Sequence, residues 1–202
     1  MLFDDTYQSI AGPAEGFFKD KGSKFLAYAF PVENDSQAKV QLNNLYELHP
    51  KAVHHCYAYR LGADRMSYRI SDDGEPSGTA GRPILNTLYS KNITNVLVVV
   101  VRYFGGTLLG VPGLINAYKT ATEIALELAE IVTRHYFSIY RLSFQYPQMN
   151  DVMRIVKEME LPVRDQLFEM QCVMDVEVRA TLVERFISRS EKVEDLAVEL
   201  AG

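Results

Sequence analysis

The chain is poor in cysteine and contains no tryptophan. Its 202 residues include two cysteines, Cys56 and Cys172, and because these lie far apart in the sequence, no disulfide framework is expected. The longest hydrophobic run, Val96–Val101, is far shorter than the ~20 residues of a membrane-spanning helix. The first residues, MLFDDTYQ, carry acids where a secretion signal would carry basic residues and an apolar stretch. We therefore expect a cytoplasmic protein with no membrane partner.

The chain also lacks an excess of positive charge. It has 21 lysines and arginines against 26 aspartates and glutamates, which gives a net charge of −5. Strong non-specific binding of nucleic acid usually comes with a basic chain, so the composition disfavours that class of protein. The hydrophobic content of 48% is enough to bury an ordinary core.

The spacing of hydrophobic residues in the first two thirds of the chain predicts alternating strands and helices. A hairpin is expected around the turn 19–24, and a helix from the caps at 34–36 to about Leu48. Strands are expected at 52–61 and 66–70, joined by a turn at 62–65, and a short helix at about 83–89. Val96–Val101 predicts a strand covered on both sides. A long helix then begins near Pro112, with an apolar stripe from Leu114 to Leu128.

A domain boundary is expected between Ile131 and His135, which gives two domains, 1–131 and 135–202. Beyond the boundary the predicted elements follow the order βαββαβ, which is that of a ferredoxin-like domain. The methionines at 149, 153, 159, 170 and 174 are expected in its core. The fold class predicted for the whole chain is α+β.

Two glycine-rich loops flank the Val96–Val101 strand. Seven glycines fall between Ser71 and Gly113, and glycine at this density marks turns or close backbone approach. We expect the loops 72–81 and 102–110 to lie side by side and to form one cleft. The candidate cleft residues are Asp72, Asp73, Glu75, Ser77, Thr79, Arg82, Arg102, Tyr103, Gly105 and Gly106.

The charged residues of this cleft allow several interpretations. The acidic cluster at 72–75 could bind a divalent cation through its carboxylates, although turn formation is the default for Asp-Gly beside proline. Alternatively, Asp72 or Asp73 pairs with Arg82 or Arg102 and holds the two loops together. The two glycines at 105 and 106 serve either an anion site or close packing against the loop 77–81. Neither loop has a nucleotide-binding fingerprint, and we assign no cofactor and no metal.

Two further groups of residues have alternative interpretations. His54 and Cys56 share one face of a strand, so a cysteine nucleophile activated by histidine is conceivable; a buried cysteine beside a half-buried histidine is favoured. Lys19, Lys21 and Lys24 alternate with phenylalanines, as in surfaces that bind a nucleic-acid backbone and stack its bases. The favoured alternative is an ordinary hairpin with its phenylalanines inward and its lysines outward.

Five segments resemble, in the same order, the signature of the YigZ/IMPACT family. They are KGSKF (21–25), HPKAVHHCYAY (49–59), DDGEPSGTAGRPIL (72–85), VVVVRYFGGTLLG (98–110) and GLINAY (113–118). The resemblance covers residues 15–130, and it implies a first domain like the second domain of ribosomal protein S5, followed by a ferredoxin-like domain. Pro112 and Asn116 replace the small and the basic residue of many members, and the lost cation weakens a phosphate-binding role for that helix face.

The resemblance also implies a function. Eukaryotic members of the family regulate translation by binding a large ribosome-associated protein. Our leading hypothesis is therefore a cytosolic, non-catalytic regulator of translation that contacts RNA, the ribosome or a protein partner, and an acidic chain fits a protein partner best. The rival hypothesis is an enzyme of unknown reaction that uses the two glycine-rich loops as an anion or metal pocket.

Overall fold

The computed structural model describes residues 5–62 and 66–201. The chain divides into two compact units, Tyr7–Arg134 and His135–Gly202, and the segment up to Thr6 groups with the second unit. The predicted first domain began at residue 1, so the division differs from the prediction at this end. The predicted turn at 62–65 lies mostly outside the described residues.

The first unit is built on a five-stranded sheet of order β2-β3-β6-β4-β5. Its strands are β2 (Ala14–Asp20), β3 (Ser23–Pro31), β4 (His54–Leu61), β5 (Ser67–Ser71) and β6 (Val96–Tyr103). The central strand β6 pairs antiparallel with both β3 and β4. Val96–Val101 is fully buried, which confirms the prediction of a strand covered on both sides.

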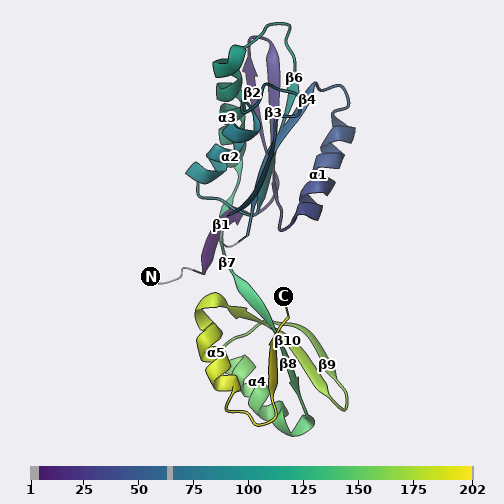
Figure 1. Ribbon diagram of the computed structural model, residues 1–202, viewed down its shortest axis with the longest axis vertical. Coiled ribbons are helices and arrows are strands. Elements are labelled where there is room, and N and C mark those ends of the chain that lie inside the picture. Colours follow the sequence, from purple (N-terminus) through teal and green to yellow (C-terminus); the bar gives the residue numbers. More distant parts are fainter. Residues whose placement is uncertain (1–4, 63–65, 202) are drawn as a thin grey trace. The chain divides into compact units, whose positions relative to one another are not determined.

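Helices cover both faces of this sheet (Figure 1). On one face, α2 (Gly81–Ser90) and α3 (Gly110–Leu128) pack on a core that includes Phe25, Val98 and Tyr118. On the other face, α1 (Asp35–Leu48) packs on a second core. The α1 helix begins where the sequence predicts, because the Asn34 side chain accepts a hydrogen bond from the Gln37 amide.

The second unit contains a four-stranded antiparallel sheet of order β11-β8-β10-β9. In chain order its elements are β8 (Phe137–Phe144), a 3-10 turn η1 (Tyr146–Gln148), α4 (Met149–Glu158), β9 (Val163–Phe168), β10 (Cys172–Arg179), η2 (Ala180–Leu182), α5 (Val183–Ser190) and β11 (Ala197–Leu200). This βαββαβ order matches the prediction. Side chains from α4, α5 and the sheet form its core.

Three features differ from the expectations. Strands β1 (Thr6–Ile10) and β7 (Ile131–His135) form a two-stranded sheet, whereas only a boundary was expected at 131–135. The apolar stripe of α3 ends earlier than predicted, because Leu126 is buried and Leu128 is exposed. Not all the methionines are buried: Met170 is 99% exposed beside the edge strand β9, and Met153 is also exposed.

No helix within the described residues has the length and apolar composition needed to span a bilayer.

Candidate functional site

A buried ion pair joins the two glycine-rich loops. Arg102 lies near the end of β6, and Glu75 belongs to the loop that leads into α2. The Arg102 Nη1 donates to Glu75 Oε1 at 2.5 Å, and the two side chains are 6% and 3% exposed. The loops are therefore in contact at this point, as the sequence predicts. The predicted partner of Arg102 is wrong, however: it is Glu75, and neither Asp72 nor Asp73.

The Glu75 carboxylate has two more neighbours, from other elements. The Tyr118 hydroxyl, on α3, donates to Glu75 Oε1 at 2.8 Å. His54, on β4, places its Nε2 3.8 Å from the same oxygen. The Nδ1 of His54 lies 2.7 Å from the carbonyl oxygen of Asp73. Since a carbonyl can only accept, this nitrogen carries the proton, and the ring is held in one orientation.

The thiol of Cys56 lies beneath this cluster. Its Sγ is 3.0 Å from the Asp72 carbonyl oxygen and 3.3 Å from the Tyr118 hydroxyl. Burial raises the pKa of the Cys56 thiol far above its ordinary value, and burial also raises the pKa of Tyr118. Because the thiolate is the nucleophilic form, this environment opposes a catalytic cysteine and agrees with the favoured interpretation of a buried thiol.

The two aspartates before Glu75 bind backbone groups. Asp72 Oδ1 accepts from the amides of Ala80 and Gly81, at 3.0 and 2.8 Å, and its Oδ2 accepts from Gly78 N at 2.8 Å. Asp72 therefore satisfies the first amides of α2, where a carboxylate interacts favourably with the helix dipole. Asp73 Oδ2 accepts from the His55 amide at 2.6 Å. These contacts match the turn-forming interpretation of the acidic cluster.

The carboxylates do not converge on one point. Within residues 5–62 and 66–201, no group of three or more His, Cys, Asp or Glu side chains is arranged to hold a metal ion. The positive end of α2 is likewise filled from within the chain, because Asp72 already occupies it. An external anion would have to displace that carboxylate.

Of the two glycines after Arg102, Gly105 packs against the β2–β3 turn. A Cβ on Gly105 would lie 2.0 Å from the carbonyl carbon of Gly22, which leaves no room for any side chain. The Gly105 amide donates to Ser23 Oγ at 3.1 Å, and Arg102 Nη2 lies 3.4 Å from the same oxygen. The alternative in which these glycines pack on the loop 77–81 is therefore wrong for Gly105, whose neighbour is the turn at Gly22, and a Cβ on Gly106 would meet no atom within 4 Å.

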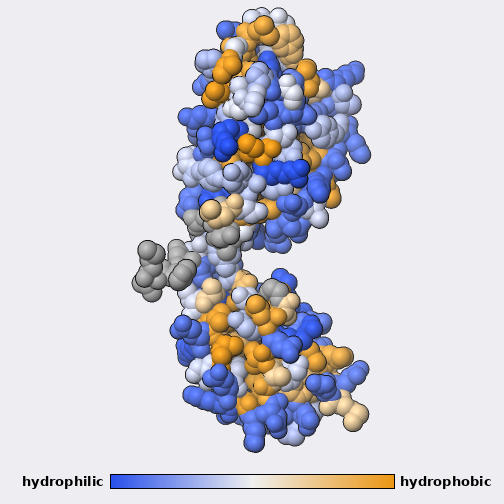
Figure 2. Space-filling view, in the orientation of Figure 1, coloured by the Kyte–Doolittle hydropathy of each residue, from blue (hydrophilic) through white to orange (hydrophobic). Residues whose placement is uncertain are grey.

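A cavity of about 370 Å³ opens above the ion pair, between the end of β6 and the start of α3. We call it the β6–α3 cavity. Glu75, Arg102 and His54 are its polar residues, and its other walls are almost entirely apolar. Those walls are formed by Val53, Pro76, Phe104, Leu108, Leu109, Gly110, Val111 and Leu114. In Figure 2, apolar residues appear in orange at the end of the first unit where the loop from β6 to α3 lies.

The remaining predicted cleft residues lie elsewhere. The Thr79 hydroxyl donates to the Pro76 carbonyl within its own loop, and Ser77 is exposed. Tyr103 belongs to the opposite face of the sheet, where its hydroxyl is 2.9 Å from His49 Nδ1. Gly106 has a φ of +86°, which glycine adopts without strain.

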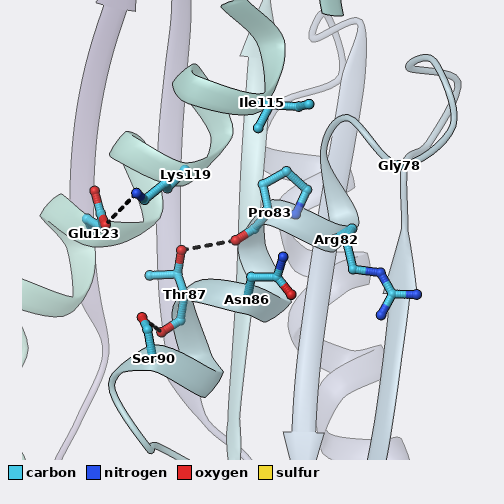
Figure 3. A pocket seen from close by; sticks show the side chains of 9 residues that line it. All are labelled: Gly78, Arg82, Pro83, Asn86, Thr87, Ser90, Ile115, Lys119 and Glu123. Atoms are coloured by element: carbon cyan, nitrogen blue, oxygen red, sulfur yellow. Dashed lines mark hydrogen bonds and ion pairs between the residues drawn. The ribbon is translucent and has the colours of Figure 1, made fainter. Parts of the chain in front are cut away.

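Arg82 lines a second depression, of about 570 Å³, between α2 and α3. Figure 3 shows its guanidinium pointing away from Lys119 and Glu123, which form an ion pair with each other on α3. Asp72 and Asp73 bind backbone amides instead, so the predicted pairing of Arg82 with either aspartate is wrong for the described residues. The sequence predicted one cleft, and the structure places Arg82 and Arg102 in two different cavities.

The three lysines of the β2–β3 hairpin are exposed. Lys19 and Lys24 are directly opposite each other across the two strands, and Lys21 lies in the turn with a φ of 43°. Phe25 is buried, whereas Phe17 is 54% exposed. The expectation that the phenylalanines point inward therefore does not hold for Phe17.

Known proteins resemble this chain in sequence and in fold. The model of the Impact N-terminal domain matches residues 21–126. An IMPACT family member from Haemophilus influenzae is 32% identical over 170 residues, which cover 83% of this chain and 82% of the relative. YigZ of Escherichia coli is 30% identical over 181 residues, 89% of each chain. A crystal structure of a hypothetical protein matches with a TM-score of 0.77 and 27% identity over 98% of both chains.

Proposed function

This chain belongs to the IMPACT family, and from that premise we propose that it is a cytoplasmic, non-catalytic binding protein that regulates translation through a ribosome-associated protein partner. The resemblance of its signature segments to the eukaryotic members implies a role of this kind. Family membership supports the assignment to translation. The choice of a binding role over catalysis rests on the geometry of the signature loops.

One observation carries this choice: the carboxylates of the loop 72–81, Arg102 and the Cys56 thiol bind one another or the backbone. Asp72 binds three amides, Glu75 binds Arg102 and Tyr118, and the Cys56 thiol is buried with a raised pKa. A catalytic acid or base needs an accessible proton site at a reacting atom. In these loops the surface offered to a ligand is mainly apolar, which favours binding.

Ribosome sedimentation tests the proposal. Ribosomes prepared from the source cells at low salt are compared with ribosomes washed in about 1 M salt, which screens charge contacts and releases loosely held proteins. We expect the protein to pellet with unwashed ribosomes and to lose this association after the wash. Adding the wash fraction back is expected to restore it, because the partner is then present again.

Other results of this assay contradict the proposal. Equal binding to washed ribosomes would show that the protein contacts the ribosome itself. If the protein bound neither preparation, a role in translation would be excluded. A control uses the wash fraction after protease treatment. Restoration by the digested fraction would exclude a protein partner.

A second candidate partner, RNA, is favoured by the β2–β3 hairpin. Lys19 and Lys24 are directly opposite each other on adjacent strands, and like charges in such positions are destabilising. A phosphate group held between them would relieve the repulsion, and the exposed Phe17 ring offers a surface for stacking a base. The test is the salt dependence of binding to a single-stranded RNA, compared between the unaltered protein and a variant without the two lysines.

A further inference from the structure

The loop between β6 and α3 exposes more apolar surface than its own packing requires. Leu108 is 82% exposed, and Phe104 and Val111 are about half exposed on either side of it. Val53, which precedes β4, adds a fourth exposed apolar side chain on the same cavity. Contiguous apolar surface of this kind marks an interaction site in soluble proteins.

We propose that the β6–α3 cavity receives an apolar side chain from an acidic, amphipathic segment of a protein partner. This inference rests on the proposed function to the extent that the occupant is a protein. It adds the place of contact and the chemistry of the contacting segment.

The shape of the site favours a protein segment over a small molecule. A cavity of about 370 Å³ can hold one large apolar side chain, and its walls are almost entirely apolar. A small molecule inside the cavity would leave Leu108 in water. A segment that inserts one side chain and lies across the rim would also cover Leu108 and Val111, in the arrangement of an anchor residue surrounded by contacts that exclude water.

The charges around the cavity favour an acidic segment. The chain carries no acidic side chain between Arg102 and Leu114. In the facing loop, Glu75 is paired with the Arg102 cation, and Asp72 and Asp73 accept from backbone amides. Helix α3 begins at the cavity with no side-chain cap and no acid in its first turn, so its positive end is not neutralised. Lys51, two residues before Val53, and Lys21, in the turn that contacts Gly105, are both exposed.

The floor of the cavity is already fixed. Glu75 and Arg102 are paired, Tyr118 binds Glu75, and Ser23 binds the start of the loop. A segment that docks here therefore meets a site whose polar groups do not need to reorganise. Such preorganisation improves affinity because fewer groups are ordered during binding.

Peptide display tests the inference directly. The full chain is used to select from a library of random peptides of about 16 residues, a length that allows an amphipathic helix or an extended segment. We expect the recovered peptides to share at least one large apolar residue and to carry more acids than bases. The variants Leu108→Asp and Val111→Asp are expected to reduce recovery at least about tenfold.

Matched variants distinguish the loss of the binding site from the loss of the folded structure. An aspartate at position 111 lies in the first turn of α3, where a carboxylate stabilises the helix. Leu128→Asp makes the same change at an exposed leucine near the other end of α3 and is expected to leave recovery unchanged. Replacing Lys21 and Lys51 by glutamate is expected to weaken binding, whereas the same change at the exposed Lys39 is not.

Three results would overturn the inference: recovery of predominantly basic peptides, equal recovery by the Leu108→Asp variant, or no recovery by the unaltered protein. The ribosome assay separates this failure from failure of the proposed function. If the unaltered protein and Leu108→Asp bind unwashed ribosomes equally, the cavity is not the contact, and the proposed function stands. If the unaltered protein does not bind ribosomes, the proposed function fails. The peptide selection then still tests whether the β6–α3 cavity binds an acidic, amphipathic segment.

Discussion

Replacing Arg102 by alanine would leave the Glu75 carboxylate buried without its cation. The side chain of Glu75 is 3% exposed, and the Tyr118 hydroxyl would be its remaining close donor among the described residues. Removing one partner of a buried ion pair costs roughly 3–5 kcal/mol, because the other charge stays in a medium that solvates it poorly. We expect Arg102→Ala to destabilise the first unit by this amount.

A double variant separates the effect of the unpaired charge on stability from the effect of the lost side-chain volume. Arg102→Met keeps much of the side-chain bulk, and Glu75→Gln keeps an oxygen that accepts from Tyr118. Because replacing both members of a buried pair is often close to neutral, we expect the double variant to recover most of the stability that Arg102→Met alone loses. The interaction energy follows from the cycle of single and double variants.

Thermal unfolding followed by circular dichroism measures the effect. At roughly 2–4 °C per kcal/mol for a chain of this size, Arg102→Ala should lower the midpoint by about 6–20 °C. Because the chain divides into two compact units, hydrogen exchange of the β6 amides assigns the change to the first unit. A loss below about 1 kcal/mol, or a double variant no better than the single one, would refute this reasoning.

Close contacts, burial and charge give three further predictions. Gly105→Ala should lower the free energy of unfolding by about 3 kcal/mol or more, because its Cβ meets backbone atoms of the β2–β3 turn. Gly12→Ala has free space and should change the unfolding midpoint little. Cys56 should resist alkylation in the native protein at about pH 8 and react after denaturation, because burial raises its pKa; rapid native labelling would contradict its assignment as a structural thiol. If RNA binds the hairpin through its three exposed lysines, the slope of log affinity against log salt should be roughly −2, and alanine at Lys19 and Lys24 should flatten it by about 1.4. An unchanged slope would exclude these lysines.

Much of the fold could be predicted from the sequence because its signals are local. The valine run of β6 and the Asn34 cap of α1 are contained in short segments, and β10 of the second unit alternates buried and half-buried residues. The β1–β7 pair escaped prediction because its two short strands lie more than a hundred residues apart. The prediction failed at Met170 because chain position does not reveal that β9 is an exposed edge strand.

The candidate site was predicted in location but not in detail. Both aspartates are short and satisfy backbone amides nearby, whereas the longer Glu75 side chain reaches Arg102 across the two loops. Tyr118 was expected simply as part of a buried stripe. A buried tyrosine usually needs a partner for its hydroxyl, and that rule could have identified it as a member of the polar cluster.

The contact between Gly105 and Gly22 has a mechanical consequence. Because the two backbones touch and Ser23 bonds to Gly105, the hairpin turn and the loop after β6 cannot move independently. A shift of the backbone at Gly105 therefore requires a matching shift at Gly22. The start of the loop that borders the β6–α3 cavity and the turn that carries Lys21 form a single packed contact.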